Sequence, residues 1–161
     1  HAIDIVNGGG TGSVSFTASD PHVTEVTAGS GYLCPHLFDG YHGLDLQPAA
    51  FFALQVGRQS DDDHVTCQGG GYIASGEAGP HRLPKVHLPN NLSPLALEGF
   101  GEVQTPMRVT SGQAPAVGEP VICRHAKGGE LAERFANYLL VRDGVVVDRQ
   151  PTYRGLGWTF F

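Results

Sequence analysis

The sequence has few charged residues, and basic residues are the scarcest of them. Charged residues make up 16% of the 161 residues, against roughly 25% in a typical soluble domain. Lysine and arginine together number ten, they are scattered along the chain, and the formal net charge is −6. Because nucleic acids are bound through clustered basic side chains, this composition argues against a nucleic-acid partner.

Long apolar runs and sorting signals are also missing. No stretch approaches the ~20 apolar residues that span a bilayer, so we expect no membrane partner. The start of the chain has no basic segment followed by an apolar one, as a secretory signal requires, and it opens on His1 rather than methionine. That start suggests processing, truncation or excision, and we expect a cytoplasmic protein.

Cysteine is rare and unpaired in the sequence. Cys34, Cys67 and Cys123 are widely spaced and form no CxxC motif, which excludes a zinc ribbon and a thioredoxin-like redox site. Reduced thiols are the expected state in a cytoplasmic protein.

Glycine and proline are abundant, at 23 and 11 residues, and they separate short apolar runs. The Asp143-Gly144 pair between two apolar runs predicts a β-hairpin over residues 138–147. Residues 129–136 carry the one helical pattern, and residues 75–94 read as a long irregular loop. We therefore predict a mainly β protein, with further strands expected at residues 2–6, 23–26, 31–34, 49–56, 64–74, 98–109 and 119–124.

Residues 7–13 (NGGGTGS) end the first predicted strand in a glycine loop. Such a loop can turn its backbone N–H groups inward and bind an anion, usually phosphate. It is not a Walker A loop, since no Gly-Lys-Ser/Thr follows, and no convincing helix and second strand continue it as in a dinucleotide fold. A flexible turn has the same composition, and glycine count alone favours that simpler interpretation.

Few side chains point to catalysis. His125 and Lys127 lie between a predicted strand and the helical segment, where histidine can act as a metal ligand or an acid/base and lysine supplies positive charge. The hydroxyl of Tyr32 could reach a phosphate or donate a proton, and a structural role is equally ordinary for it. The Cys34-Pro35-His36 motif is too short to predict a metal. From the residues alone, the sequence indicates a soluble β-rich domain with a candidate anion loop.

Several segments together resemble one family. The chain is similar to the C-terminal half of D-threonine-aldolase/D-serine-dehydratase-like proteins, especially the bacterial branch labelled amino-acid deaminase. The likeness covers nearly the whole chain, and the Arg-His-Ala-Lys stretch is specific to that branch. The segments that carry it are residues 6–13, 24–32, 38–41, 118–121, 124–131 and 151–155.

The resemblance implies a fold-type III pyridoxal-phosphate enzyme, in which an N-terminal (β/α)8 barrel holds the cofactor and a C-terminal, barrel- or sandwich-like β domain closes the site. Residues 1–30 would be a late barrel strand with its phosphate-binding glycine loop, and residues 31–161 the β domain. Gly9, Gly10 and Thr11 are carried over as phosphate contacts. The family's cofactor-binding lysine lies on the first barrel strand, and no segment of this chain corresponds to it.

One departure from the family concerns a metal. Many members carry His-x-Cys or His-x-Asp in the β domain and bind Zn²⁺ or Mn²⁺ there, which polarises the substrate hydroxyl. The matching residues here are His125-Ala126-Lys127, and an ammonium has no lone pair for a cation. We expect no divalent metal, with His125 as the ligand if one binds, and we assign His125, Lys127 and Tyr32 as candidate catalytic residues.

The function that the resemblance implies is that of the C-terminal domain of a pyridoxal-phosphate-dependent lyase or deaminase. Its substrate would be a small β-hydroxy D-amino acid such as D-serine or D-threonine, and the protein would be a homodimer. Aldol cleavage and alanine-racemase-like racemisation are alternatives. Because the cofactor-binding lysine is missing, a non-catalytic β module that binds a phosphorylated ligand or mediates dimerisation also stays open.

Overall fold

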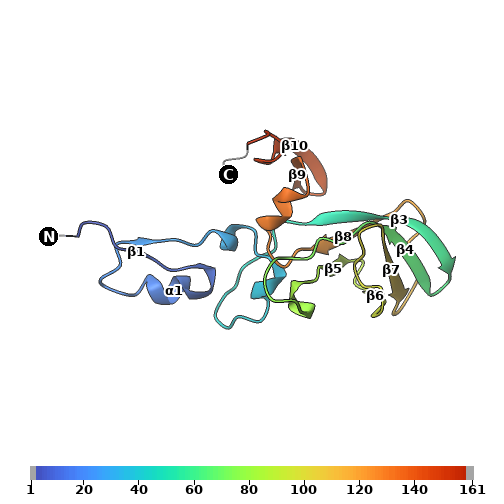
Figure 1. Ribbon diagram of the computed structural model, residues 1–161, viewed down its shortest axis with the longest axis horizontal. Helices are drawn as coiled ribbons and strands as arrows, with labels where there is room; N and C mark the ends of the chain where they lie inside the picture. The colour runs from blue at the N-terminus through green and yellow to red at the C-terminus, as the bar shows by residue number, and fades with distance from the viewer. Residues whose placement is uncertain (1–2, 159–161) are drawn as a thin grey trace. The chain divides into compact units, whose positions relative to one another are not determined.

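A six-stranded antiparallel sheet dominates the structure, a computed structural model that describes residues 3–158. Its strands are adjacent in the order β5-β8-β3-β4-β7-β6 (Figure 1). The two edge strands are consecutive in the chain, so the sheet curls toward closure into a barrel. This confirms the predicted mainly β fold. The strands are β3 (Phe52–Asp61), β4 (His64–Gln68), β5 (Lys85–Leu88), β6 (Leu92–Pro94), β7 (Gln104–Val109) and β8 (Pro120–Arg124).

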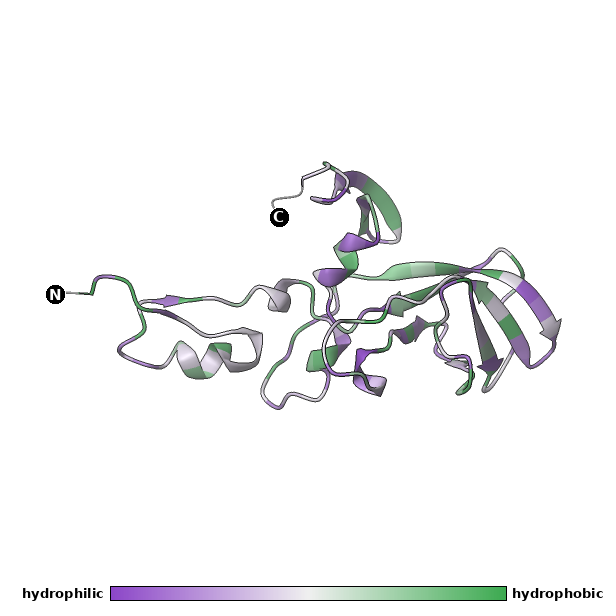
Figure 2. Cartoon of the chain, in the orientation of Figure 1, coloured by the Kyte–Doolittle hydropathy of each residue, from purple (hydrophilic) through white to green (hydrophobic). Residues whose placement is uncertain are grey.

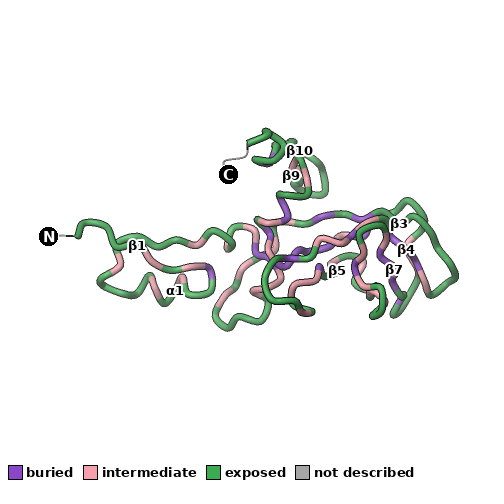
Figure 3. Tube along the Cα trace, in the orientation of Figure 1, coloured by how far each residue is buried: buried purple, intermediate pink, exposed green. Residues whose placement is uncertain are grey.

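The core lies on the inner face of this sheet. Along β3, Phe52, Leu54 and Val56 are buried while the residues between them are exposed (Figure 3). That alternation follows from the two-residue period of a strand, and each fully buried aliphatic side chain contributes about 1.5–3 kcal/mol. The neighbouring strands complete the core with Val65, Cys67, Met107, Val121 and Cys123.

The prediction of an irregular loop over residues 75–94 was wrong, because this stretch contains β5 and β6. Both are short edge strands of four and three residues, hydrogen-bonded on one side only, β5 to β8 and β6 to β7. Proline is tolerated at sheet edges, so prolines 84, 89 and 94 concealed the strand pattern. Within residues 3–158, no helix is long and apolar enough to cross a bilayer.

The N-terminal segment forms a small β-α-β arrangement. Strand β1 (Asn7–Gly8) leads through a 3₁₀ turn (Thr11–Ser13) into α1 (Val14–Thr17), and β2 (Glu25–Val26) pairs in parallel with β1 (Figure 1). The strand expected at residues 2–6 therefore begins later, and its residue 2 lies outside the described residues. A helix and a second strand do follow the glycine loop, contrary to expectation. Residues 31–34 form no strand; a 3₁₀ turn (Ser30–Tyr32) and a loop take their place.

Residues 129–161 form a separate unit from residues 1–128. The predicted hairpin is confirmed as β9 (Asn137–Arg142) and β10 (Val145–Pro151), joined by Asp143 (φ 51°) and Gly144 (φ 76°). The expected helix shrinks to a 3₁₀ turn (Glu130–Glu133). Valines and leucines along the hairpin are hydrophobic and exposed (Figures 2 and 3).

Candidate functional site

Two parallel strands bring two glycine-containing loops to one edge. Asn7 of β1 lies opposite Glu25 of β2, and Gly8 lies opposite Val26. The loop of residues 9–13 follows β1, and a second loop, residues 27–32, follows β2. Because the carboxyl ends of neighbouring parallel strands meet at the same edge, the two loops emerge side by side. This is where barrels and open α/β sheets bind phosphate.

Thr11 is the most unusual side chain of the first loop. It is 6% exposed, and its hydroxyl is buried without a hydrogen-bond partner among the described residues. The hydroxyl faces Gly31 of the second loop, where an added Cβ would lie 3.5 Å from it. An unpaired buried hydroxyl costs about 1–3 kcal/mol, so its presence calls for a partner such as a bound anion.

The glycines of the first loop differ in what surrounds them. Gly9 has a φ of +99°, which favours glycine. Apart from its two chain neighbours, no described residue has an atom within 4 Å of the place where a Cβ of Gly10 would be. Gly12 packs directly against the ring of Tyr41, so any side chain there would displace the ring. Tyr41 is therefore a contact of the glycine loop.

Tyr32 ends the 3₁₀ turn of the second loop, next to Gly31. Its side chain is 84% exposed. Its neighbour Gly31 contacts Thr11, so the structure places Tyr32 beside the candidate anion loop. Its role in phosphate contact or proton transfer stays a prediction.

An arginine–aspartate pair anchors the segment that follows Tyr32. The Arg124 guanidinium is buried, donates to both Asp39 carboxylate oxygens at 3.0 and 2.7 Å, and donates to the Cys34 carbonyl oxygen at 3.1 Å. Lys85 adds a more exposed bond to the same carboxylate at 3.2 Å. Partial burial pushes the pKa of Asp39 upward, but the bonds from Arg124 and Lys85 outweigh it and hold that pKa below its usual value.

The same segment connects the glycine loops to the predicted catalytic stretch. The backbone N–H of His36 donates to the His125 carbonyl oxygen at 3.2 Å. Leu33 packs so closely on Gly128 that an added Cβ would lie 3.0 Å from that of leucine. Thr11, Tyr32 and His125 were separate motifs in the sequence, and in the structure one short segment links them.

His125 is held by the backbone of its own turn. The ring is buried, and its Nδ1 lies 2.6 Å from the Lys127 carbonyl oxygen and 2.9 Å from the Lys127 backbone nitrogen. The Lys127 ammonium donates to the hydroxyl of Ser75 at 2.9 Å. Ser75 was not expected from the sequence, since it lies in the stretch interpreted as an irregular loop.

Metal ligands do not gather at either suggested place. In the described part of the chain, no three or more His, Cys, Asp or Glu side chains are placed to hold a metal ion. His36 Nε2 lies 2.8 Å from the Leu83 carbonyl oxygen, and the Cys34 thiol donates to the Leu46 carbonyl oxygen at 3.4 Å. Both side chains of that motif thus have protein partners.

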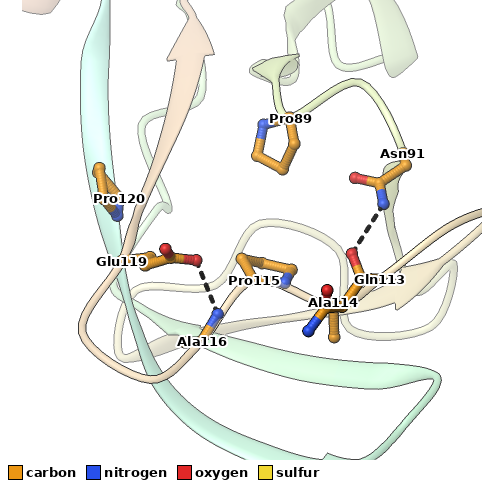
Figure 4. A pocket seen from close by; sticks show the side chains of 8 residues that line it. All are labelled: Pro89, Asn91, Gln113, Ala114, Pro115, Ala116, Glu119 and Pro120. Carbon is orange, nitrogen blue, oxygen red and sulfur yellow. Dashed lines mark hydrogen bonds between the residues drawn. The ribbon is translucent and has the colours of Figure 1, made fainter.

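An open pocket of about 500 Å³ lies away from all of these residues (Figure 4). It lies between the β5–β6 connection and the start of β8, and prolines, alanines and three polar side chains (Asn91, Gln113 and Glu119) line it. Within it, Glu119 accepts from the Ala116 backbone N–H at 2.8 Å, and Asn91 donates to the Gln113 carbonyl oxygen at 3.1 Å. Its polar side chains mostly hydrogen-bond to the backbone of the surrounding loop, and none of the predicted site residues lines the pocket.

No protein-family model matches the chain, and no curated protein sequence matches it. Among solved structures, the chain is similar to the crystal structure of D-threonine aldolase from Filomicrobium marinum, with a TM-score of 0.73 and 18% identity. The similarity covers 94% of this chain and 41% of the aldolase chain. The chain therefore spans less than half the length of that enzyme, and at this identity the similarity shows that the two share a fold.

Proposed function

We propose that this chain is the C-terminal part of a pyridoxal-phosphate-dependent lyase or deaminase of β-hydroxy D-amino acids such as D-serine or D-threonine. The fold shared with a D-threonine aldolase supports this assignment. The observation that carries it is the buried, unpaired hydroxyl of Thr11 at the edge where two parallel strands end. Such an edge is a recurrent phosphate site in barrels.

The residues of the first glycine loop fit a phosphate group. Thr11 supplies a hydroxyl that lacks a hydrogen-bond partner among the described residues. Gly9 and Gly10 have no side chains, so a ligand can reach the backbone next to this hydroxyl. Hydrogen bonds to charged groups are worth about 1.5–3 kcal/mol, so a phosphate oxygen would offset the cost of burying this hydroxyl. Gly31 lets the second loop approach without a side chain in the way.

Pyridoxal phosphate, when bound, supplies the electron sink for breaking a bond at the substrate Cα. Thr11 and the glycines would hold its phosphate and so fix its orientation. Tyr32 would either add a phosphate contact or move a proton at its hydroxyl. The lysine that binds the cofactor would come from a barrel strand outside this chain, and of the two lysines present, Lys85 is bonded to Asp39 and Lys127 to Ser75.

Several finer points belong to the same proposal. We propose that residues 1–30 belong to the cofactor barrel and residues 31–161 to the β domain. The protein would be a cytoplasmic homodimer, and the exposed apolar hairpin of β9 and β10 offers surface for association. Racemisation and a non-catalytic module for a phosphorylated ligand remain the alternatives.

The phosphate site can be tested with Thr11→Val in the full-length protein. We expect the affinity for pyridoxal phosphate to fall roughly 10-fold or more, because one bond to a charged group is lost. Pyridoxal, which lacks the phosphate, should bind wild type and variant equally. Binding is followed by the visible absorbance of the cofactor, and Thr11→Ser, which keeps the hydroxyl, serves as the matched control.

Stability separates a binding role from a structural one. Removing an unsatisfied hydroxyl in favour of a methyl of similar shape should leave the thermal midpoint unchanged or slightly higher. Equal affinity of the wild type for pyridoxal and pyridoxal phosphate would refute the phosphate site. Binding of inorganic phosphate without any cofactor-specific absorbance would instead favour the non-catalytic module.

A further inference from the structure

Many members of the family that this chain resembles bind a divalent metal in the β domain, and the residues described here do not fit one. Catalytic zinc is held by three protein ligands in addition to a water or substrate, whereas no such group exists among the described residues. At the matching position, the Nδ1 atom of His125 already contacts the backbone of Lys127. The second family ligand is replaced by the side chain of Lys127.

We propose that the ammonium of Lys127, together with the hydroxyl of Ser75, forms a metal-independent site for the carboxylate of the amino-acid substrate. The inference rests on the proposed function, since it assigns one part of the substrate to residues of this chain. The positive charge of the ammonium takes the place of a metal cation.

The geometry supports a built site. Lys127 Nζ donates to Ser75 Oγ at 2.9 Å, across 52 residues of sequence. The backbone of Lys127 is fixed from the other side, because its nitrogen and its carbonyl oxygen both contact the buried His125 ring. The ammonium therefore extends from a rigid turn, with a hydroxyl beside it.

The chemistry of the two groups suits an oxyanion better than a cation. An ammonium has three donors and no acceptor, and a serine hydroxyl can both accept and donate. Beside an ammonium, a divalent cation would meet like charge, which is unfavourable at short range. A carboxylate would instead gain charge-assisted hydrogen bonds.

His125 is a positioning residue in this arrangement. Its ring is 3% exposed and bonds the backbone of the turn that carries Lys127. Replacing it would loosen the turn, whereas replacing Lys127 removes the charge and leaves the turn in place.

The test compares Lys127→Met with Lys127→Arg and with Lys85→Met, which removes the lysine of strand β5, all in the full-length protein. The probes are D-serine and ethanolamine, the same molecule without its carboxylate. We expect Lys127→Met to weaken D-serine binding roughly 10- to 100-fold while ethanolamine binding stays the same. Lys127→Arg should retain most of the preference for D-serine over ethanolamine, and Lys85→Met should retain all of it.

Metal content provides a readout that does not depend on activity. The wild type, purified without chelator, should contain no stoichiometric Zn²⁺ or Mn²⁺ by elemental analysis and should bind none in calorimetric titration. One tightly bound ion per chain that disappears in His125→Ala would overturn the proposal, as would an unchanged preference for D-serine in Lys127→Met.

Failure of the proposed function gives a different result. In that case the wild type binds neither pyridoxal phosphate nor D-serine, and all three lysine variants behave alike. If the wild type binds the cofactor normally and only the carboxylate preference is missing, the phosphate site stands and Lys127 has another role.

Discussion

Replacing Asp39 with asparagine removes the negative partner of a buried arginine. The Arg124 side chain is 9% exposed and donates to both Asp39 oxygens, while the aspartate side chain is 34% exposed. Asparagine offers one acceptor oxygen in place of two and carries no charge. The guanidinium of Arg124 would then be left buried without its counter-charge.

The expected loss of folding stability follows from how exposed the Arg124 and Asp39 side chains are. Removing one partner of a fully buried pair costs about 3–5 kcal/mol, whereas exposed pairs are worth about 0–1 kcal/mol. Because Asp39 is about one-third exposed, we expect a loss of roughly 2–3 kcal/mol, between these limits. For a chain of this size, that loss lowers the thermal midpoint by roughly 5–10 °C.

Thermal unfolding followed by near-ultraviolet circular dichroism measures this difference. Lys85→Met is the control, because it removes the exposed bond to the same carboxylate and should cost less than about 1 kcal/mol. If Asp39→Asn costs no more than Lys85→Met, the buried pair does not anchor the segment, and the reasoning is wrong.

The Asp39–Arg124 pair should also make the folding stability depend on pH, with stability lost toward acid. The pKa of Asp39 is lowered in the folded state, net of the upward effect of burial, so its contribution is complete above the unfolded pKa of about 3.9. It is lost as the pH falls through the lower folded pKa. The gap in stability between wild type and Asp39→Asn should therefore be constant near neutrality and shrink below pH ~4.

Two further predictions concern the barrel core. Gly70 has a φ of +119°, and an added Cβ would overlap the hydroxyl of Thr105. Gly70→Ala should therefore destabilise the protein by about 2–3 kcal/mol, as measured by urea unfolding. The comparison is Gly99→Ala, because Gly99 also has a positive φ but has open space where its Cβ would lie. Burial raises the pKa of Cys67 to about 11 and, together with the Cys67 thiolate, that of Cys123 to about 12. Both thiols should resist a thiol-specific reagent at pH 8 until the protein unfolds, and rapid labelling of the native protein would contradict their burial.

Local sequence chemistry was sufficient for elements that depend on neighbouring residues. The Asp143-Gly144 turn adopts the positive φ values that a tight hairpin needs. The apolar run around β3 predicted a core strand, and alternate side chains in the first half of β3 are buried. The scarcity of charge and the many turn residues were enough to indicate a mainly β fold.

Edge strands and short parallel strands were not readable in this way. β5 and β6 are four and three residues long, and the prolines that flank β5 and end β6 are typical of a loop. β1 and β2 have two residues each, too few to show a period. Only their partners in the sheet make them strands, because their hydrogen bonds are to residues distant in sequence.

The candidate site also has features that the sequence alone predicted and features that only the tertiary structure decided. The sequence by itself identified the glycine loop and the His125–Lys127 stretch, since glycine, histidine and lysine carry their chemistry wherever they lie. Only the tertiary structure decided that the Thr11 hydroxyl is buried without a partner, that Ser75 meets Lys127, and that Arg124 pairs with Asp39 across 85 residues. Burial and pairing depend on which strands lie side by side, and that order is a property of the whole fold.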